Sequence, residues 1–307
     1  MSDDLQIILT AGLVGTATGL LGPFLVLRRV ALVGDAVSHA VLPGIVAVYL
    51  LAHTRSPVPV VIGASVFAVL CVLGIDALRA TRLVRSDAAI GLVFPALFSL
   101  GVLGISRYAA DIHLDLDSTI YGEIAFVPFQ AVTIGGVEVA RSIVELAIVS
   151  LLNLTLVVAL WKELKASTFD PGFAQTIGIR PALLSRLLLI AVAVTAVIAF
   201  ESVGAILVVA LLIVPAATAY LLTDRLWAMV ALAVLVGWVS AVAGHAGAMA
   251  ADASIAGAMG LVAACAFLLA LLASPRHGLV ARAITRSRRR RRLRAALRAG
   301  GGAETAA

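Results

Sequence analysis

Nine long apolar segments follow one another along this sequence of 307 residues, and they constrain its fold more than any other feature. A helix needs about 20 apolar residues to cross the ~30 Å hydrocarbon core of a bilayer, and each segment has between 17 and 23. Very few residues separate the sixth segment from the seventh. The sequence therefore predicts an all-α fold, a polytopic bundle of about eight to nine transmembrane helices. The segments are Leu5–Leu27, Ala36–Ala52, Val58–Leu78, Ala88–Ser106, Ile143–Trp161, Pro181–Phe200, Val203–Leu222, Trp227–Ala243 and Ile255–Ala273.

The composition excludes an ordinary soluble domain. Hydrophobic residues make up 62% of the chain and charged residues 13%, and the mean hydropathy is +1.11. Soluble domains have about 45–50% apolar and about 25% charged residues. Both cysteines, Cys71 and Cys265, lie inside apolar segments. We therefore expect them to be small core residues rather than a disulfide.

The distribution of basic residues predicts how the chain is oriented in the membrane. The net charge of +6 comes from a tail, because ten of the 23 Lys and Arg residues lie from Arg276 onward. With the N-terminus outside, 20 of the 23 face the cytoplasm, where basic loops stay, and only Arg55, Arg107 and Arg141 do not. We therefore expect an outer N-terminus and a cytoplasmic C-terminus. The basic tail, residues 276–307, is expected to be disordered and either to contact anionic lipid or only to fix the orientation, with no nucleic-acid partner.

The segment Gly34–Gly44, GDAVSHAVLPG, carries the residues that best suit a chemical function. Asp35 and His39 are four apart, so a helix places both side chains on one face. They follow Arg29 by six and ten residues, roughly 9–15 Å into the bilayer at helical rise and near its midplane. An intramembrane Asp is costly, and a carboxylate with an imidazole suits a first-row divalent metal. We interpret the pair as a transient transport site; the alternative is an Asp–His or Asp–Ser hydrogen bond that only fixes helix packing.

A polar loop after the fourth segment offers further cation ligands. His113, Asp115 and Asp117 alternate with leucines, so in an extended chain all three would face one way. The loop either forms a funnel that attracts cations by its negative field or is a plain solvated loop. Glu201 and His245 stand alone near the outer ends of helices, and we expect both to be interfacial polar residues.

The inner loop after the fifth segment is predicted to contain a short helix. Asp170 can cap a helix that begins at Pro171, and Gly178 can end it. Three apolar residues recur every four positions and form one stripe: Phe169, Phe173 and Ile177. The stripe suits either docking to a soluble partner or contact with the lipid surface, and both interpretations stay open.

Two absences limit the possible activities. The only lysines are Lys162 and Lys165, and neither follows a glycine, so a phosphate-binding loop of the Gly-Lys-Ser/Thr type is excluded. The chain therefore cannot be its own ATPase. It also lacks a His-Glu-x-x-His pair, the commonest signature of an intramembrane metalloprotease.

Six ordered blocks resemble the integral-membrane permeases of bacterial ABC transporters that import zinc, manganese or iron with a substrate-binding lipoprotein. The resemblance spans nearly the whole chain, and its specificity lies in the order of the blocks. The blocks are Arg28–Arg29 with Gly34–Gly44; Gly91–Leu97; His113–Asp117 with Tyr121–Glu123; Phe169–Pro171 through Ala174 and Gly178; Val203–Ala217; and Pro275–Leu279.

This resemblance implies a permease like those of type II ABC importers, with residues 1–275 as its transmembrane domain. It implies that Asp35 and His39 are the metal-coordinating pair in the membrane. It also implies that residues 168–179 contain the coupling helix, which docks in a groove of the ATPase subunit. The coupling residues would be Phe169, Asp170, Pro171, Ala174 and Gly178.

The resemblance also implies the partners, the cargo and the cellular location. The partners are a P-loop ATPase, a metal-binding lipoprotein receptor and a second permease, either the same chain or a paralogue, in the bacterial cytoplasmic membrane with its lipid. The chain would be a transport subunit rather than an enzyme, with no permanently bound cofactor. Its cargo would be Mn²⁺, Zn²⁺ or Fe²⁺, and the Tyr121–Glu123 block favours manganese. The alternative function is an ion- or proton-coupled secondary metal transporter, in which Asp35 and His39 would relay protons.

Overall fold

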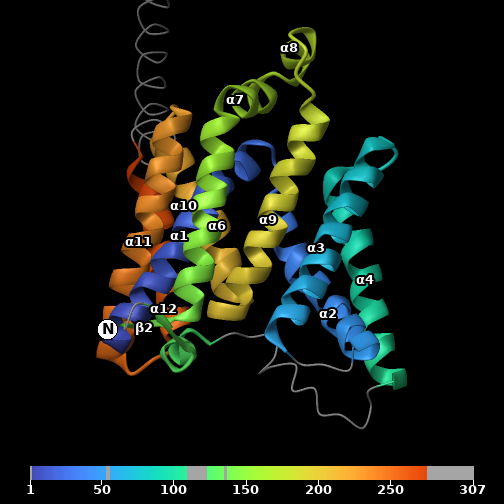
Figure 1. Ribbon diagram of the computed structural model, residues 1–307. Helices are drawn as coiled ribbons and strands as arrows, with labels where there is room; N and C mark the ends of the chain where they lie inside the picture. Colours follow the sequence, from blue (N-terminus) through green and yellow to red (C-terminus); the bar gives the residue numbers. More distant parts are fainter. Residues whose placement is uncertain (1, 53–55, 109–122, 135–136, 275–307) are drawn as a thin grey trace, which may run out of the picture.

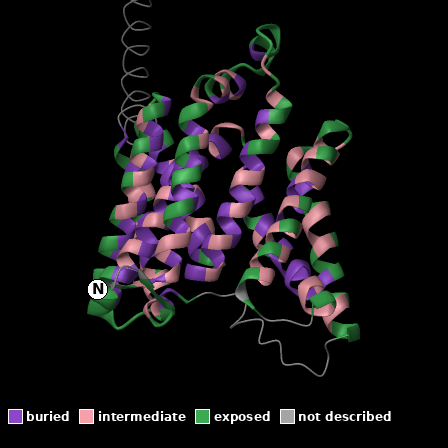
Figure 2. Cartoon of the chain, in the orientation of Figure 1, coloured by how far each residue is buried: buried purple, intermediate pink, exposed green. Residues whose placement is uncertain are grey.

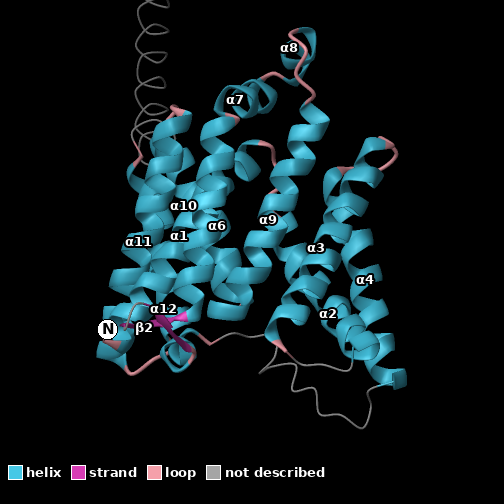
Figure 3. Cartoon of the chain, viewed as in Figure 1, coloured by secondary structure: helices cyan, strands magenta, loops and turns pink. Residues whose placement is uncertain are grey.

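Helices make up nearly all of the chain that the computed structural model describes, which is residues 2–52, 56–108, 123–134 and 137–274 (Figures 1 and 3). Within these ranges nine helices are long and apolar enough to cross a membrane, which confirms the predicted bundle. They are α1 (Asp3–Leu27), α2 (Val33–Ala52), α3 (Pro57–Ala80), α4 (Ser86–Tyr108), α6 (Arg141–Ala159), α9 (Pro181–Val203), α10 (Ala205–Leu222), α11 (Leu226–Ala251) and α12 (Ile255–Ala273).

Short elements lie at the two ends of the bundle. Helices α7 (Trp161–Phe169) and α8 (Pro171–Thr176) stand at the end opposite the N-terminus, and α8 projects beyond the long helices (Figure 1). At the N-terminal end, the 3₁₀ helix η1 (Ile124–Phe129) precedes an antiparallel hairpin of β1 (Ala131–Ile134) and β2 (Val137–Ala140). The hairpin was not predicted, because each strand has only four residues.

One helix boundary explains why two expected segments lie so close together, and two others differ from the expected ends. Gly204 has φ +84°, a conformation that favours glycine, and it divides α9 from α10 where the sequence leaves little separation. Trp161 begins α7 instead of ending a long helix. Helix α11 continues to Ala251, beyond the expected end at Ala243, because residues in its last turns are buried against neighbouring helices.

Helix α1 is the centre of the bundle. It is buried around most of its circumference and contacts α6, α9, α10 and α11 (Figure 2). Helices α2, α3 and α4 form a group on the other side of α9, and α4 is mostly exposed. Cys71 of α3 is buried, as expected, whereas Cys265 of α12 is exposed, and both are free thiols. An apolar residue on an outer helix can face lipid without a hydrophobic penalty.

Glycines let α1 approach its neighbours at backbone distance. A Cβ added to Gly15 would stand 3.0 Å from the Cα of Gly237 on α11, and one added to Gly22 would overlap the carbonyl oxygen of Leu212 on α10. Close packing of this kind is a main source of helix association in lipid. By contrast, Gly260 of α12 has no neighbour within 4 Å of an added Cβ.

Buried polar side chains join helices that are far apart in sequence. Asn153 of α6 donates from Nδ2 to the carbonyl oxygen of Ala17 on α1, at 3.2 Å, and to Oγ1 of Thr195 on α9, at 2.9 Å. Trp238 of α11 donates from Nε1 to Oγ1 of Thr16 at 2.9 Å. Each such bond contributes about 0.6 kcal/mol in a membrane protein, so these bonds supplement the glycine contacts around α1.

We predict that Gly22→Ala lowers the thermal stability of the purified protein in detergent. The new methyl group has to displace the α10 backbone, and overpacking of this kind costs about 1–3 kcal/mol. The matched control is Gly260→Ala, which adds the same methyl group to open space and should leave the melting temperature unchanged or raise it slightly, since Ala is the better helix former. Equal melting temperatures for the two variants would contradict the packing described for α1.

Candidate functional site

The predicted metal pair lies on one exposed face of α2. Asp35 and His39 are both exposed, whereas Val33, Ala36 and Ala40 beside them are buried. The spacing of four residues therefore places both side chains on the same helix face, as expected. This leaves the carboxylate oxygens and the imidazole nitrogens open to a ligand from outside the chain.

Close contacts with neighbouring helices fix the orientation of α2. A Cβ added to Gly34 would stand 2.5 Å from Cδ2 of Leu212 on α10, and one added to Gly44 would stand 2.5 Å from the carbonyl oxygen of Gly63 on α3. Helix α4 packs along a further side. The metal pair lies on the exposed side of α2, next to α4.

Two phenylalanines of α4 orient the His39 ring. The ring of Phe94 is stacked on it with a centroid distance of 5.4 Å and an interplanar angle of 24°, and Phe98 meets it edge-on at 5.8 Å and 84°. Such ring pairs contribute about 0.5–1.5 kcal/mol beyond burial. They hold the imidazole without using its nitrogens. These two residues were not predicted, although their spacing of four places them on one face of a helix.

The hydrogen bonds around the pair do not support a purely structural role. The Ser38 hydroxyl donates to the backbone carbonyl oxygen of Asp35 at 2.6 Å, so it does not engage the carboxylate. Within the described part of the chain, no hydrogen bond joins the Asp35 carboxylate to the His39 ring or to the Ser38 hydroxyl. The alternative in which an Asp–His or Asp–Ser bond fixes helix packing is therefore not what the structure contains.

The start of α2 differs from the continuous helix that the depth of Asp35 was reckoned on. The expected depth of roughly 9–15 Å assumed helical rise from Arg29 onward, but residues 28–32 form turns and α2 begins at Val33. Arg29 itself has φ +57°. Asp35 therefore occupies the first turn of α2, where the helix dipole favours a negative charge.

The pair is too small to hold a metal ion alone. Among the residues that the structure describes, no group of three or more His, Cys, Asp or Glu side chains could hold a metal. Zinc sites in proteins, for example, have three or four protein ligands as a rule. Any ion bound by Asp35 and His39 therefore needs ligands from outside this part of the chain, from another molecule or from water.

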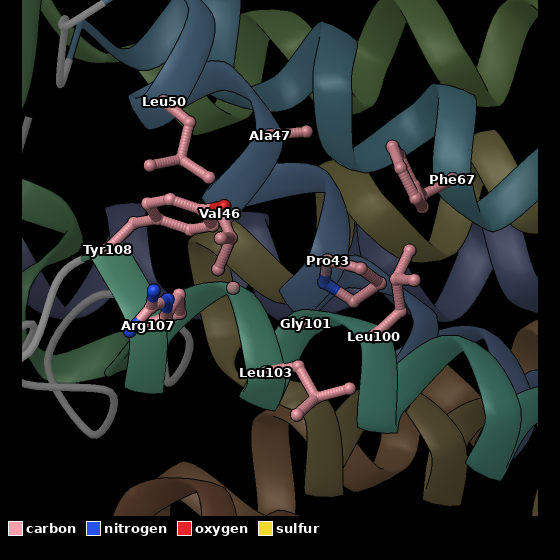
Figure 4. Close-up of a pocket in the computed structure, with 11 residues that line it drawn as sticks. Pro43, Val46, Ala47, Leu50, Phe67, Leu100, Gly101, Leu103, Arg107 and Tyr108 are labelled. Atoms are coloured by element: carbon pink, nitrogen blue, oxygen red, sulfur yellow. The ribbon is translucent and has the colours of Figure 1, made fainter.

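An apolar groove continues along the same side of α2 (Figure 4). It has a volume of about 470 Å³ and runs between α2 and α4, past Pro43, Val46 and Leu50, to Arg107 and Tyr108 at the end of α4. Among the described residues that line it there is no acidic side chain, and an arginine repels a divalent cation. These lining residues therefore extend the surface beside the metal pair but do not offer metal ligands.

The predicted short helix is present as α8. Asp170 accepts a hydrogen bond at Oδ1 from the backbone N–H of Phe173, 2.9 Å away, Pro171 is the first helical residue, and Gly178 follows the helix with φ +83°. A cap of this kind is worth about 1 kcal/mol. Ala174 is buried, which fixes α8 against the rest of the chain. The three residues of the apolar stripe remain exposed: Phe169, Phe173 and Ile177.

Glu201 and His245 differ from each other in their surroundings. His245 is buried, and its Nε2 lies 3.0 Å from Oδ1 of Asp4, so it joins α11 to the start of α1 and is not an isolated interfacial residue. Ala241, His245 and Ala248 lie on one face of α11, and all three are buried. Glu201 is half-buried at the end of α9. The three predicted funnel residues lie outside the described residues: His113, Asp115 and Asp117.

Comparison with known proteins identifies the family. Residues 5–274 match the model of the ABC 3 transport family. The chain belongs to this family. An ABC 3 protein of this kind is a multi-pass membrane permease subunit and not the ATPase of its transporter, in agreement with the absence of a phosphate-binding loop in the sequence.

Several proteins are similar to this ABC 3 permease over most of its length. It is 42% identical over 281 residues to the manganese transport system membrane protein MntD of Bacillus subtilis, covering 91% of this chain and 95% of MntD. It is 44% identical over 280 residues to the zinc transport system membrane protein TroD of Treponema pallidum, covering 91% and 76%. The solved structure of PsaBC from Streptococcus pneumoniae in complex with Fab matches with a TM-score of 0.73 at 30% identity, covering 90% of this chain and 94% of that one.

Proposed function

We propose that this permease carries a divalent transition metal, with Mn²⁺ as its main cargo, across the bacterial cytoplasmic membrane in an ATP-driven importer. The observation that supports this most is the exposed pair of Asp35 and His39 on one side of α2, whose side chains have no hydrogen-bonding partner among the described residues. The names of related permeases point to the same class of cargo, since MntD belongs to a manganese system and TroD to a zinc system.

The chemistry of the pair suits a cargo ion better than a resident one. One carboxylate and one imidazole supply two ligands, and a second copy of the chain facing the first would bring the total to four. Such a mixed O and N site binds Mn²⁺, Fe²⁺ and Zn²⁺, with intrinsic affinity lowest for Mn²⁺. Weak binding favours release, so Mn²⁺ would leave this site most readily, and selectivity would come from the receptor that delivers the ion.

The remaining parts of the chain take their roles from this proposal. The N-terminus lies outside, residues 1–275 form the transmembrane domain, and residues 276–307 form a cytoplasmic tail near anionic lipid. A lipoprotein receptor delivers the metal, and the funnel of His113, Asp115 and Asp117 attracts it. A second permease, identical or paralogous, completes the path. A P-loop ATPase drives the change of access through the coupling segment, residues 168–179.

The exposed apolar residues in and beside α8 are the proposed ATPase contact. Phe169, Phe173 and Ile177 are each more than half exposed, while Ala174 fixes the helix from the other side. A short capped helix that projects from the bundle (Figure 1) suits a groove in a soluble subunit better than a flat lipid surface, because its apolar residues would fill a concave partner.

We predict that Asp35→Asn lowers Mn²⁺ import by at least about tenfold in proteoliposomes that contain permease, ATPase and receptor, because loss of one charged ligand costs more than ~1.4 kcal/mol. Assembly with the ATPase should be unchanged. The matched control is Asp87→Asn, since Asp87 is an exposed acid in the first turn of α4, and it should import normally. Wild-type import by Asp35→Asn would remove the site assignment. Competition among Mn²⁺, Zn²⁺ and Fe²⁺ in the same assay identifies the preferred cargo.

We predict that Phe173→Ser weakens binding of the ATPase subunit by about 10- to 100-fold, because burial of a Phe side chain contributes about 1.5–3 kcal/mol. Affinity can be measured by surface plasmon resonance with immobilised permease. The control is Phe129→Ser, which removes an exposed phenylalanine at the other end of the molecule. An unchanged affinity of the Phe173 variant, with loss of binding to lipid vesicles instead, would show that α8 is an interfacial helix.

A further inference from the structure

Arg28 links the end of α1 to α7, which leads directly into α8. Its Nε donates to Oγ1 of Thr168 at 3.0 Å, and its Nη2 donates to Oγ of Ser167 at 2.9 Å. Ser167 is 95% buried, since its exposed fraction is 5%, and its hydroxyl in turn donates to the carbonyl oxygen of Leu164 at 3.2 Å. The guanidinium is therefore held in a defined position by two side chains of one helix.

Burial disfavours the charged form of Arg28, and its two hydrogen bonds offset that free-energy cost. Burial lowers the pKa of the Arg28 guanidinium from its ordinary value, because a low-dielectric environment disfavours the charged form. The planar guanidinium can direct two N–H groups at two acceptors simultaneously, whereas a lysine ammonium is a point charge on a flexible stem. The site thus selects the geometry of arginine and not only its charge.

A second contact attaches the other end of α7 to the same part of α1. The ring of Trp161, the first residue of α7, meets the fully buried ring of Phe24 edge-on at a centroid distance of 6.3 Å and an angle of 83°. Helix α7 is therefore held at its start by Phe24 and at its end by Arg28. It can move only together with the end of α1 or by breaking one of these contacts.

The segment from Arg28 to α2 is short and well packed. Six residues separate Arg28 from Asp35. The turn between them is closed by a hydrogen bond from the N–H of Val30 to the carbonyl oxygen of Leu25, at 2.9 Å. Val30 and Val33 are buried. Because this connection is short and packed, a displacement of Arg28 should also displace the first turn of α2, which carries Asp35.

We propose that Arg28 is a positioning residue of the transport cycle, whose two hydrogen bonds to Ser167 and Thr168 transmit movement of α7 and α8 to the turn that leads into α2. This rests on the proposed function, in which α8 receives the ATPase and Asp35 with His39 holds the ion. Through this link, the movement that the ATPase imposes on α8 changes the orientation of Asp35 and His39. Arg28 acts through α2 and does not touch the cargo.

The experiment measures Mn²⁺ imported per ATP hydrolysed by the complete transporter in proteoliposomes. Arg28→Lys and the pair Ser167→Ala with Thr168→Val should each lower this ratio by at least about tenfold, the loss expected for a hydrogen bond to a charged group, while ATPase binding stays unchanged. Combining the variants should lower it no further, because they remove the same bonds. The matched control is Arg29→Asn, which removes an exposed neighbouring arginine and tolerates its positive φ; its ratio should equal that of the wild type.

The outcomes separate this inference from the proposed function. A wild-type ratio for the Arg28 variant, with import abolished in Asp35→Asn, would overturn the role of Arg28 alone. Normal import by Asp35→Asn would overturn the metal site, and the ratio of the Arg28 variant would still report on coupling. The ion pair between Arg186 of α9 and Asp76 of α3, with Nε 2.7 Å from Oδ2, is the other candidate link. If Arg186→Gln lowered the import ratio and Arg28→Lys did not, that ion pair would carry the movement and the inference would be overturned. If Arg28→Lys fails to assemble, the near-isosteric Thr168→Val gives the same test.

Discussion

The absence of water in a bilayer is the constraint on which the rest of this structure depends. Backbone groups in lipid have to be satisfied inside helices, and helices surrounded by apolar tails have to associate by close packing and a few polar bonds. Helix α1 shows how this sequence meets both demands. Gly15 and Gly22 bring it to the backbones of α11 and α10. Asn153 of α6 donates hydrogen bonds to α1 and to α9. Helices α2 and α3 contact α9, while α4 packs on α2 and α3 and α12 packs on α10 and α11.

The same packing leaves Asp35 and His39 of α2 exposed, and these residues carry the chemistry. Helices α3, α9 and α10 contact other parts of α2, while Phe94 and Phe98 of α4 hold the His39 ring and leave its nitrogens open. Two polar side chains without hydrogen-bonding partners in a membrane-spanning helix cost free energy. A second molecule, an ion or water therefore has to contact them. The proposed transport site meets that need, whereas the apolar groove beside it does not. At the end of the bundle that carries α7, Arg28 lies in the turn between α1 and α2 and bonds to α7, which leads to the proposed ATPase contact.

The apolar segments of the sequence were sufficient to predict the helix number, because length and hydropathy are local properties. The short helix α8 was also predictable, since Asp170, Pro171 and Gly178 act on their own neighbours. The contacts that depend on tertiary structure were not predictable from the sequence. No feature of the neighbouring sequence indicates that His245 contacts Asp4, 241 residues away, or that Arg28 contacts Thr168, 140 residues away. The turn at residues 28–32 was not predicted for the same reason, because it depends on packing.

The central claim is that Asp35 and His39 form the transport site. It is tested most directly by anomalous X-ray scattering at the manganese absorption edge, from crystals of the complete transporter soaked in Mn²⁺. The account predicts an anomalous peak at bonding distance from a carboxylate oxygen of Asp35 and a ring nitrogen of His39, with matching ligands from a second permease copy. A peak bound by other residues of the transmembrane region, with none at Asp35 and His39, would contradict it.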